Sequence, residues 1–156
     1  MLKKIIPWVV VGIFAAVFVG AFALKDTMNS TISEMMKQQA SPDLTSSGEA
    51  LVDSLYNYTK NGGIYEITFL EFGSTGCAAC KRMESVLEEI RVKYPDKVNV
   101  VFLNILKPES QLLMKYYGIA VIPTQVLLDK GGKEFFRHSG FIDTGDLEKE
   151  FNSFRE

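Results

Sequence analysis

Cysteine and histidine are scarce in this chain of 156 residues, which contains two cysteines, Cys77 and Cys80, and one histidine, His138. A closed zinc site needs four ligands from cysteine, histidine or carboxylate side chains, and beyond the pair the chain offers only the distant His138. Covalent haem attachment at this spacing requires histidine directly after the second cysteine, where Lys81 stands. The zinc interpretation is therefore weak and haem attachment is excluded, so we expect no metal and no other cofactor. His138 is expected to be an ordinary surface or core residue.

Once zinc and haem are set aside, two main functions remain for the Cys77/Cys80 pair: thiol–disulfide exchange and a structural disulfide. Only Ala78 and Ala79 lie between the cysteines. A bridge that closes so small a ring removes little conformational entropy from the unfolded chain, so it would stabilise the fold poorly. Binding of a soft metal such as Cu(I) is a further alternative, but these alanines are apolar and no histidine ligand is near in the sequence. The sequence therefore favours redox chemistry.

Charge is absent from Ile5 to Leu24, an apolar run that as a helix would reach roughly 30 Å, the thickness of a bilayer core. This length predicts that residues 1–24 form a signal-anchor. Lys3 and Lys4 precede the run, so the positive-inside rule predicts the N-terminus in the cytoplasm and the remainder of the chain outside it. The alternative is a cleaved signal peptide, for which residues 21–23 (Ala-Phe-Ala) supply a cleavage motif. The length of the apolar run favours the uncleaved transmembrane helix. No cysteine follows the run, so a lipidated N-terminal cysteine is excluded.

Residues 25–45 are polar, rich in Ser, Thr and Gln, and interrupted by Pro42. We interpret them as a linker or stalk, because Ile32, Met35 and Met36 form only a thin apolar stripe for a partner-binding face. With a net charge of −2 and no internal repeat, residues 46–156 suffice for one small domain. This domain is expected on the extracytoplasmic side of the membrane, either in a periplasm or at the outer face of a plasma membrane.

From residue 46 onward, helical periodicities, strand-like apolar runs and turn residues predict the order α-β-α-β-α-β-β-α. A capping-box pattern, Ser46 followed by Glu49, predicts where the first helix begins, and Pro95 predicts where the second ends. Helix-linked strands followed by a hairpin predict an α/β fold, with a central mixed β-sheet flanked by helices. The predicted strands cover residues 64–72, 98–105, 124–128 and 133–138.

The cysteine pair comes between a predicted buried strand and a predicted helix. At a helix N-terminus Cys77 would face unpaired backbone N–H groups and the positive end of the helix dipole, both of which favour thiolate over thiol. Cys80 would lie one turn inward, close enough to attack a mixed disulfide formed at Cys77. The spacing therefore predicts that Cys77 is the nucleophile and that Cys80 resolves the mixed disulfide.

Several separate motifs resemble those of thioredoxin and its membrane-tethered extracytoplasmic relatives, over residues 46–156. The strand-to-active-site segment, the next strand, the proline loop and a late glycine all have counterparts. These are Glu71-Phe72-x4-Cys77-x-x-Cys80-Lys81, Leu103-Asn104-Ile105, Tyr117-Gly118-Ile119, Ile122-Pro123-Thr124 and Gly140. The resemblance implies a thioredoxin-like fold with a redox-active disulfide between Cys77 and Cys80.

The resemblance also implies roles for residues outside the pair. Pro123 should follow a cis peptide bond, and Ile122, Pro123 and Thr124 should bind the extended chain of a substrate beside the sulfurs. Glu71 occupies the position of the family's buried acid and is a candidate proton acceptor for Cys80. The alternative for Glu71 is an ordinary charged residue at a strand end, but a carboxylate is rarely buried without a function.

The chain departs from the family pattern at the site itself. Ala78-Ala79 replaces the usual Gly-Pro between the cysteines, Gly76 replaces the aromatic residue before them, and Phe102 stands where a lysine often pairs with the buried acid. These changes alter both thiolate stability and the environment of the acid, so the sequence leaves the redox potential and its direction open.

Together these features predict a membrane-anchored thiol–disulfide oxidoreductase that reduces disulfides in exported proteins. The expected partners are disulfide-containing exported proteins, a membrane electron donor that re-reduces the pair, and the membrane itself; nucleic acid is not expected. The domain has no spare length for the helical insertion of dedicated periplasmic oxidases, which favours reduction. The alternatives are the oxidase direction, or a non-catalytic thioredoxin-fold module that binds partners or a soft metal.

Overall fold

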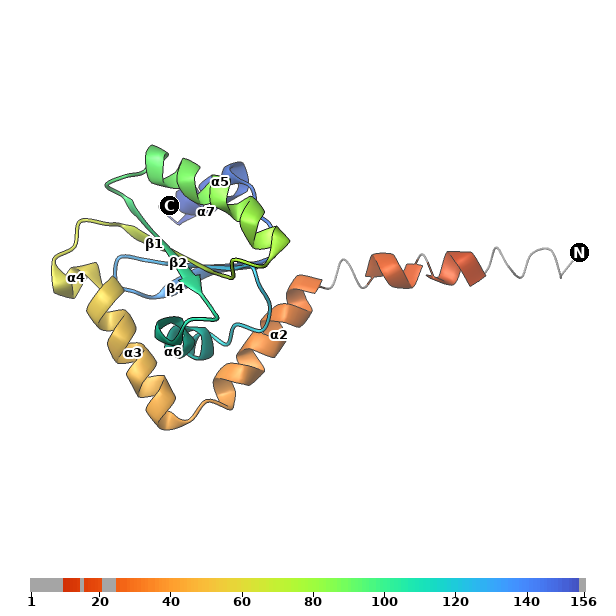
Figure 1. Ribbon diagram of the computed structural model, residues 1–156, viewed down its shortest axis with the longest axis horizontal. Helices are drawn as coiled ribbons and strands as arrows, with labels where there is room; N and C mark the ends of the chain where they lie inside the picture. The colour runs from red at the N-terminus through yellow and green to blue at the C-terminus, as the bar shows by residue number, and fades with distance from the viewer. Residues whose placement is uncertain (1–9, 15, 21–24, 155–156) are drawn as a thin grey trace, which may run out of the picture.

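The computed structural model describes residues 10–14, 16–20 and 25–154 (Figure 1). The predicted anchor over residues 1–24 therefore lies in large part outside the described residues, although 10–14 and 16–20 are helical. Within the described ranges, no helix combines the length and the apolar character needed to span a membrane. The anchor and its alternative as a cleaved signal remain predictions.

A mixed four-stranded sheet forms the centre of the domain, with the strand order β2-β1-β3-β4. Strands β1 and β2 are parallel, whereas β3 runs antiparallel to both β1 and β4. This confirms the predicted central mixed sheet. The strands are β1 (Ile67–Gly73), β2 (Val98–Asn104), β3 (Thr124–Leu128) and β4 (Glu134–Ser139).

Helices cover both faces of this sheet (Figure 1). One face packs against α5 (Ala78–Lys93) and α7 (Thr144–Ser153), and the other packs against α3 (Pro42–Tyr56) and α6 (Pro108–Tyr116). The short helix α4 (Tyr58–Asn61) follows α3 directly. The predicted flanking helices are thus confirmed.

Helix α3 begins at Pro42 instead of at the predicted capping box around Ser46. Ser41 is the N-cap: its hydroxyl accepts a hydrogen bond from the Leu44 N–H at 3.3 Å. Pro42 fits the first helical position, because the missing N–H there would have no helical partner in any case. Pro42 therefore starts a helix where the sequence pattern suggested an interruption.

The segment before α3 also contains a helix, α2 (Lys25–Gln38), which packs against α6 and β4. Ser33 of α2 is 6% exposed, and its backbone carbonyl approaches Gly118 so closely that a side chain there would collide with it. Lys37 adds an ion pair with Glu134 at 3.4 Å. Much of the stretch predicted as a linker is thus helix packed on the domain.

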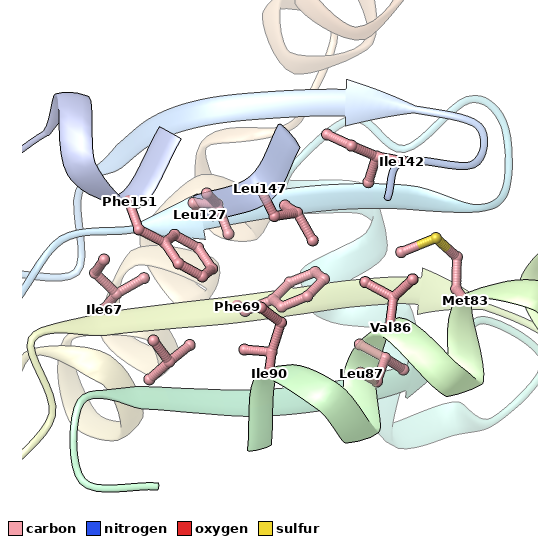
Figure 2. Packing of buried hydrophobic residues seen from close by; sticks show 11 residues of the cluster. Ile67, Phe69, Met83, Val86, Leu87, Ile90, Leu127, Ile142, Leu147 and Phe151 are labelled. Atoms are coloured by element: carbon pink, nitrogen blue, oxygen red, sulfur yellow. The ribbon is translucent and has the colours of Figure 1, made fainter. Parts of the chain in front are cut away.

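Strand β1 is buried along its whole length, because both faces of the sheet are covered. Its side chains alternate between two apolar clusters. Ile67 and Phe69 join the cluster beneath α5 and α7, shown in Figure 2, while Leu70 and Phe72 join the cluster beneath α3 and α6. Glu71 is the one ionisable side chain in this buried central strand.

Candidate active site

The two cysteines lie where the chain leaves β1 and enters α5. Cys77 is the N-cap of α5, and its sulfur accepts a hydrogen bond from the Cys80 N–H at 3.1 Å. The residues form a disulfide with their Cα atoms 5.2 Å apart. Cys77 is partly exposed, whereas Cys80 is 3% exposed. An incoming disulfide can therefore reach Cys77 first.

The same geometry favours the anionic form of Cys77 in the reduced protein. The first N–H groups of a helix have no intrahelical acceptor, and the helix dipole is positive at this end. A thiolate at the N-cap accepts from such a group. The predicted position of Cys77 at the start of a helix is confirmed.

Gly73, the last residue of β1, lies directly against Cys80. A Cβ atom on Gly73 would be 3.3 Å from the Cys80 sulfur and 2.9 Å from the Phe102 ring. Side chains two residues apart on a strand point to the same face. Glu71 therefore points to the face of the sheet on which Cys80 lies. It is two residues before Gly73, the position that contacts Cys80.

Glu71 is fully buried at 0% exposure, as the sequence predicted. Burial penalises the carboxylate and raises the pKa of Glu71 to about 8, while a hydrogen bond from Gln125 works in the opposite direction. Among the described residues, Glu71 Oε1 has no hydrogen-bond partner. Opposite Glu71 on β2 stands Phe102, which supplies no compensating charge. The acid is thus mostly protonated at neutral pH and can exchange a proton in that range.

The Ile122–Pro123 peptide bond is cis, as predicted. Thr124 pairs with Phe72 near the end of β1, so this proline loop lies at the same end of the sheet as the cysteines. Pro123 and Thr124 are buried, and the Thr124 hydroxyl donates to the Val121 carbonyl at 2.8 Å. Of the three residues predicted to bind substrate, only Ile122 keeps exposed surface.

Two exposed apolar side chains lie in the proline loop and next to it. Val121 in the loop is 39% exposed and Phe141 is 41% exposed. Phe141 follows Gly140, whose N–H donates to the Pro123 carbonyl at 2.8 Å. The Arg82 guanidinium of α5 lies over the Phe141 ring at 4.9 Å. Together these contacts place an apolar surface between the proline loop and the first turns of α5, the helix that begins after Cys77.

Gln125 was missed by sequence reasoning. It is fully buried on β3, in register with Glu71, and its amide nitrogen donates to Glu71 Oε2 at 2.9 Å. The signal was available: a glutamine stands in a five-residue strand whose next three residues are apolar.

His138 on β4 pairs in register with Gln125, and its Nε2 lies at hydrogen-bond distance, 3.2 Å, from the Phe141 carbonyl. Within the described residues, no cluster of His, Cys, Asp or Glu that could hold a metal ion is present.

Comparison with known proteins shows similarity to thioredoxin-like proteins. The family described as a thioredoxin-like domain matches residues 54–155. Thioredoxin H2-1 of Oryza sativa subsp. japonica is 31% identical over 103 residues, covering 66% of this chain and 70% of that protein. The chloroplastic thioredoxin-like protein HCF164 of Arabidopsis thaliana is 31% identical over 67 residues, but the match spans 26% of its length.

Among solved structures, a thioredoxin-2 described as a component of malaria parasite protein secretion machinery superposes with a TM-score of 0.52 at 20% identity. The match covers 56% of this chain and 82% of that one. At this identity the likeness concerns the fold, and it agrees with the mixed sheet and the helices on both of its faces.

Proposed function

The chain belongs to the thioredoxin-like domain family, and on this premise we propose that it is a thiol–disulfide oxidoreductase that reduces disulfides of exported proteins outside the cytoplasm. The main support for the proposal is the arrangement of the two cysteines and the buried acid. Cys77 is accessible at a helix N-terminus, Cys80 is buried behind it, and an ionisable acid lies on the same face beneath Cys80.

The reaction begins with both cysteines reduced. The Cys77 thiolate attacks one sulfur of the substrate disulfide, a mixed disulfide forms, and the other substrate sulfur leaves as a thiolate that takes a proton from water. Cys80 then loses its proton and attacks Cys77, which forms the Cys77–Cys80 disulfide and releases the second substrate sulfur. Two electrons pass to the substrate, and an external dithiol returns the pair to its reduced state.

Glu71 is the proposed acceptor of the Cys80 proton. With a pKa of about 8, roughly one tenth of the Glu71 carboxyls are ionised at pH 7, and the fraction rises steeply over the next pH unit. A general base with a pKa near the working pH combines availability with basicity. Only the second step needs this base, because Cys77 attacks as a preformed thiolate.

The exposed apolar surface supports a polypeptide substrate. Val121 and Ile122 in the loop and Phe141 next to it form this surface, against which an extended chain can lie. The backbone of Ile122 is the proposed pairing site for that chain, and Pro123 and Thr124 hold the loop in place. Disulfide-containing exported proteins are thus the proposed substrates.

We also propose that residues 1–24 anchor the domain to the membrane, where a membrane electron donor re-reduces it. Support comes from the apolar run itself and from the described helical residues within it, several of which expose large apolar side chains: Val11 at 59%, Phe14 at 72% and Phe18 at 75%. A domain so tethered would lie beside membrane-bound donors and newly exported chains.

The reduction potential of the Cys77/Cys80 couple tests the direction of the reaction. The full-length chain is equilibrated with dithiol–disulfide buffers, and its thiols are alkylated and counted. A potential below about −200 mV, combined with catalysed reduction of a protein disulfide such as that of insulin, supports a reductase. A potential near −120 mV is typical of strong oxidases and would contradict the proposed direction. A variant with both cysteines replaced by serine is the control.

A further inference from the structure

The buried amide of Gln125 makes two hydrogen bonds with one nitrogen. Its Nε2 donates to Glu71 Oε2 at 2.9 Å and to the Gly140 carbonyl at 3.1 Å. A side-chain amide has two N–H groups, so both donors are in use. The amide oxygen of Gln125 is buried and has no hydrogen-bond partner among the described residues.

The bond to Gly140 fixes which way the amide points. Rotating the amide by half a turn would bring the Gln125 oxygen against the Gly140 carbonyl oxygen, and two acceptors cannot share a hydrogen bond. Gly140 is itself held in place, because its N–H donates to the Pro123 carbonyl at 2.8 Å. Its φ of +104° is a conformation that glycine adopts readily. Gln125 therefore presents an N–H to Glu71 and not an oxygen.

We propose that Gln125 is a positioning residue: it orients the buried Glu71 carboxyl and selectively stabilises its ionised form, so that Glu71 can accept the Cys80 proton near neutral pH. This inference rests on the proposed function for its consequence in the reaction. A fixed N–H donor stabilises a carboxylate acceptor more than a protonated acid, whose own O–H would need an acceptor in return. Without this donor, nothing would oppose the effect of burial, which favours the protonated form of Glu71.

Few other groups near Glu71 could play this part. Phe102 faces it from β2 and Cys80 lies above it on α5, and neither offers a positive charge. His138 pairs with Gln125 from β4 and is therefore one strand further from Glu71 than Gln125 is. Burial and the Gln125 amide are the two causes of the shift in the pKa of Glu71. The charged residues in the first two turns of α5 are exposed: Lys81, Arg82 and Glu84.

The direct test is a titration of the Glu71 carboxyl carbon by NMR in the oxidised full-length chain, kept in mild detergent. Gln125→Met keeps an unbranched side chain of similar length and removes both donors. The titration midpoint of Glu71 should rise by about one to two pH units, the value of a hydrogen bond to a charged group. Leu127→Met, on the same face of β3 and equally buried, is the matched control and should leave the midpoint unchanged.

The kinetic counterpart is stopped-flow reduction of a model disulfide. At pH 7 Gln125→Met should slow the attack of Cys80 by about tenfold or more, because a smaller fraction of Glu71 is ionised, while the attack of Cys77 keeps its rate. The pH profile of the second step should move upward together with the NMR midpoint. Loss of packing alone would not move a pH profile in this way.

A Glu71 midpoint that stays within about 0.3 pH unit of the wild type in Gln125→Met would overturn the inference. Should that variant fail to fold, the wild type still decides: the two Gln125 amide protons should shift with the same midpoint as Glu71, and protons that stay unchanged would refute the role. The titration needs no turnover. A failure of the proposed function would appear instead as wild-type protein without reductase activity.

Discussion

Replacing the buried Glu71 by glutamine should stabilise the fold at neutral pH. The folded pKa of Glu71 is about 8, raised from an ordinary value of 4.5. Between these values the unfolded chain releases the proton while the folded chain keeps it, so the free energy of unfolding falls as the pH rises. At about 1.4 kcal/mol per pH unit the loss reaches about 3 kcal/mol at pH 7 and about 5 kcal/mol above pH 8.

Glutamine cannot ionise and its side-chain oxygen can accept the Gln125 hydrogen bond. Glu71→Gln should therefore match the wild type near pH 4.5 and exceed its stability by about 3 kcal/mol at pH 7. Urea unfolding followed by circular dichroism, at half-unit steps from pH 4.5 to 8.5 with the disulfide intact, measures this difference. Glu84→Gln, at an exposed position on α5, is the matched control and should stay within about 0.5 kcal/mol at every pH.

The same substitution should act in the opposite direction on catalysis. Without a base beneath Cys80, resolution of the mixed disulfide should slow by about tenfold or more while its formation is unchanged. A variant that is more stable yet slower separates loss of a base from structural damage. A stability difference that stays constant from pH 4.5 to 8.5 would refute the reasoning, because it would mean that the folded and unfolded chains titrate Glu71 alike.

Three other outcomes follow from the structure and the sequence. The intact protein should stay with membranes after carbonate washing and should begin at residue 1 or 2 on N-terminal sequencing; a mature start at residue 24 would show that the apolar run is cleaved. Gly118→Ala should cost about 2–4 kcal/mol in urea unfolding, since φ is +60° and the Ser33 carbonyl abuts the site, whereas Gly62→Ala, with φ of +76° in open space, should cost only about 1 kcal/mol. In the wild type, the rate of mixed-disulfide resolution should rise with pH up to about 8 and then level, and a rate that does not change there would remove Glu71 as the base.

Local patterns in the sequence predicted the elements that position the site. The dense apolar run of β1 and the helical stripe of α5 are patterns that one segment carries by itself. The turn residues before β4 are also a local signal. The position of Cys77 at a helix start follows from the same patterns. The cis bond before Pro123 was expected from the likeness to a family and not from composition, since most bonds before proline are trans.

What the sequence did not predict depends on segments that meet only in the folded chain. The Gln125–Glu71 bond needs the register of β1 against β3, which no local pattern encodes. The packing of α2 depends on Ser33 fitting against Gly118, a contact between a small polar residue and a glycine that leaves no apolar stripe. At α3 two start signals competed, and Ser41 with Pro42 prevailed over the capping box further on.

The most direct test of the account is a trapping experiment on the two cysteines. In membranes that carry Cys80→Ala, the mixed disulfide at Cys77 cannot be resolved, so non-reducing gels should show adducts with partner proteins that disappear on reduction. Cys77→Ala leaves only the buried Cys80 and should trap far fewer partners. Strong adducts for Cys80→Ala alone are the result that the account predicts, and equal or absent adducts in the two variants would contradict it.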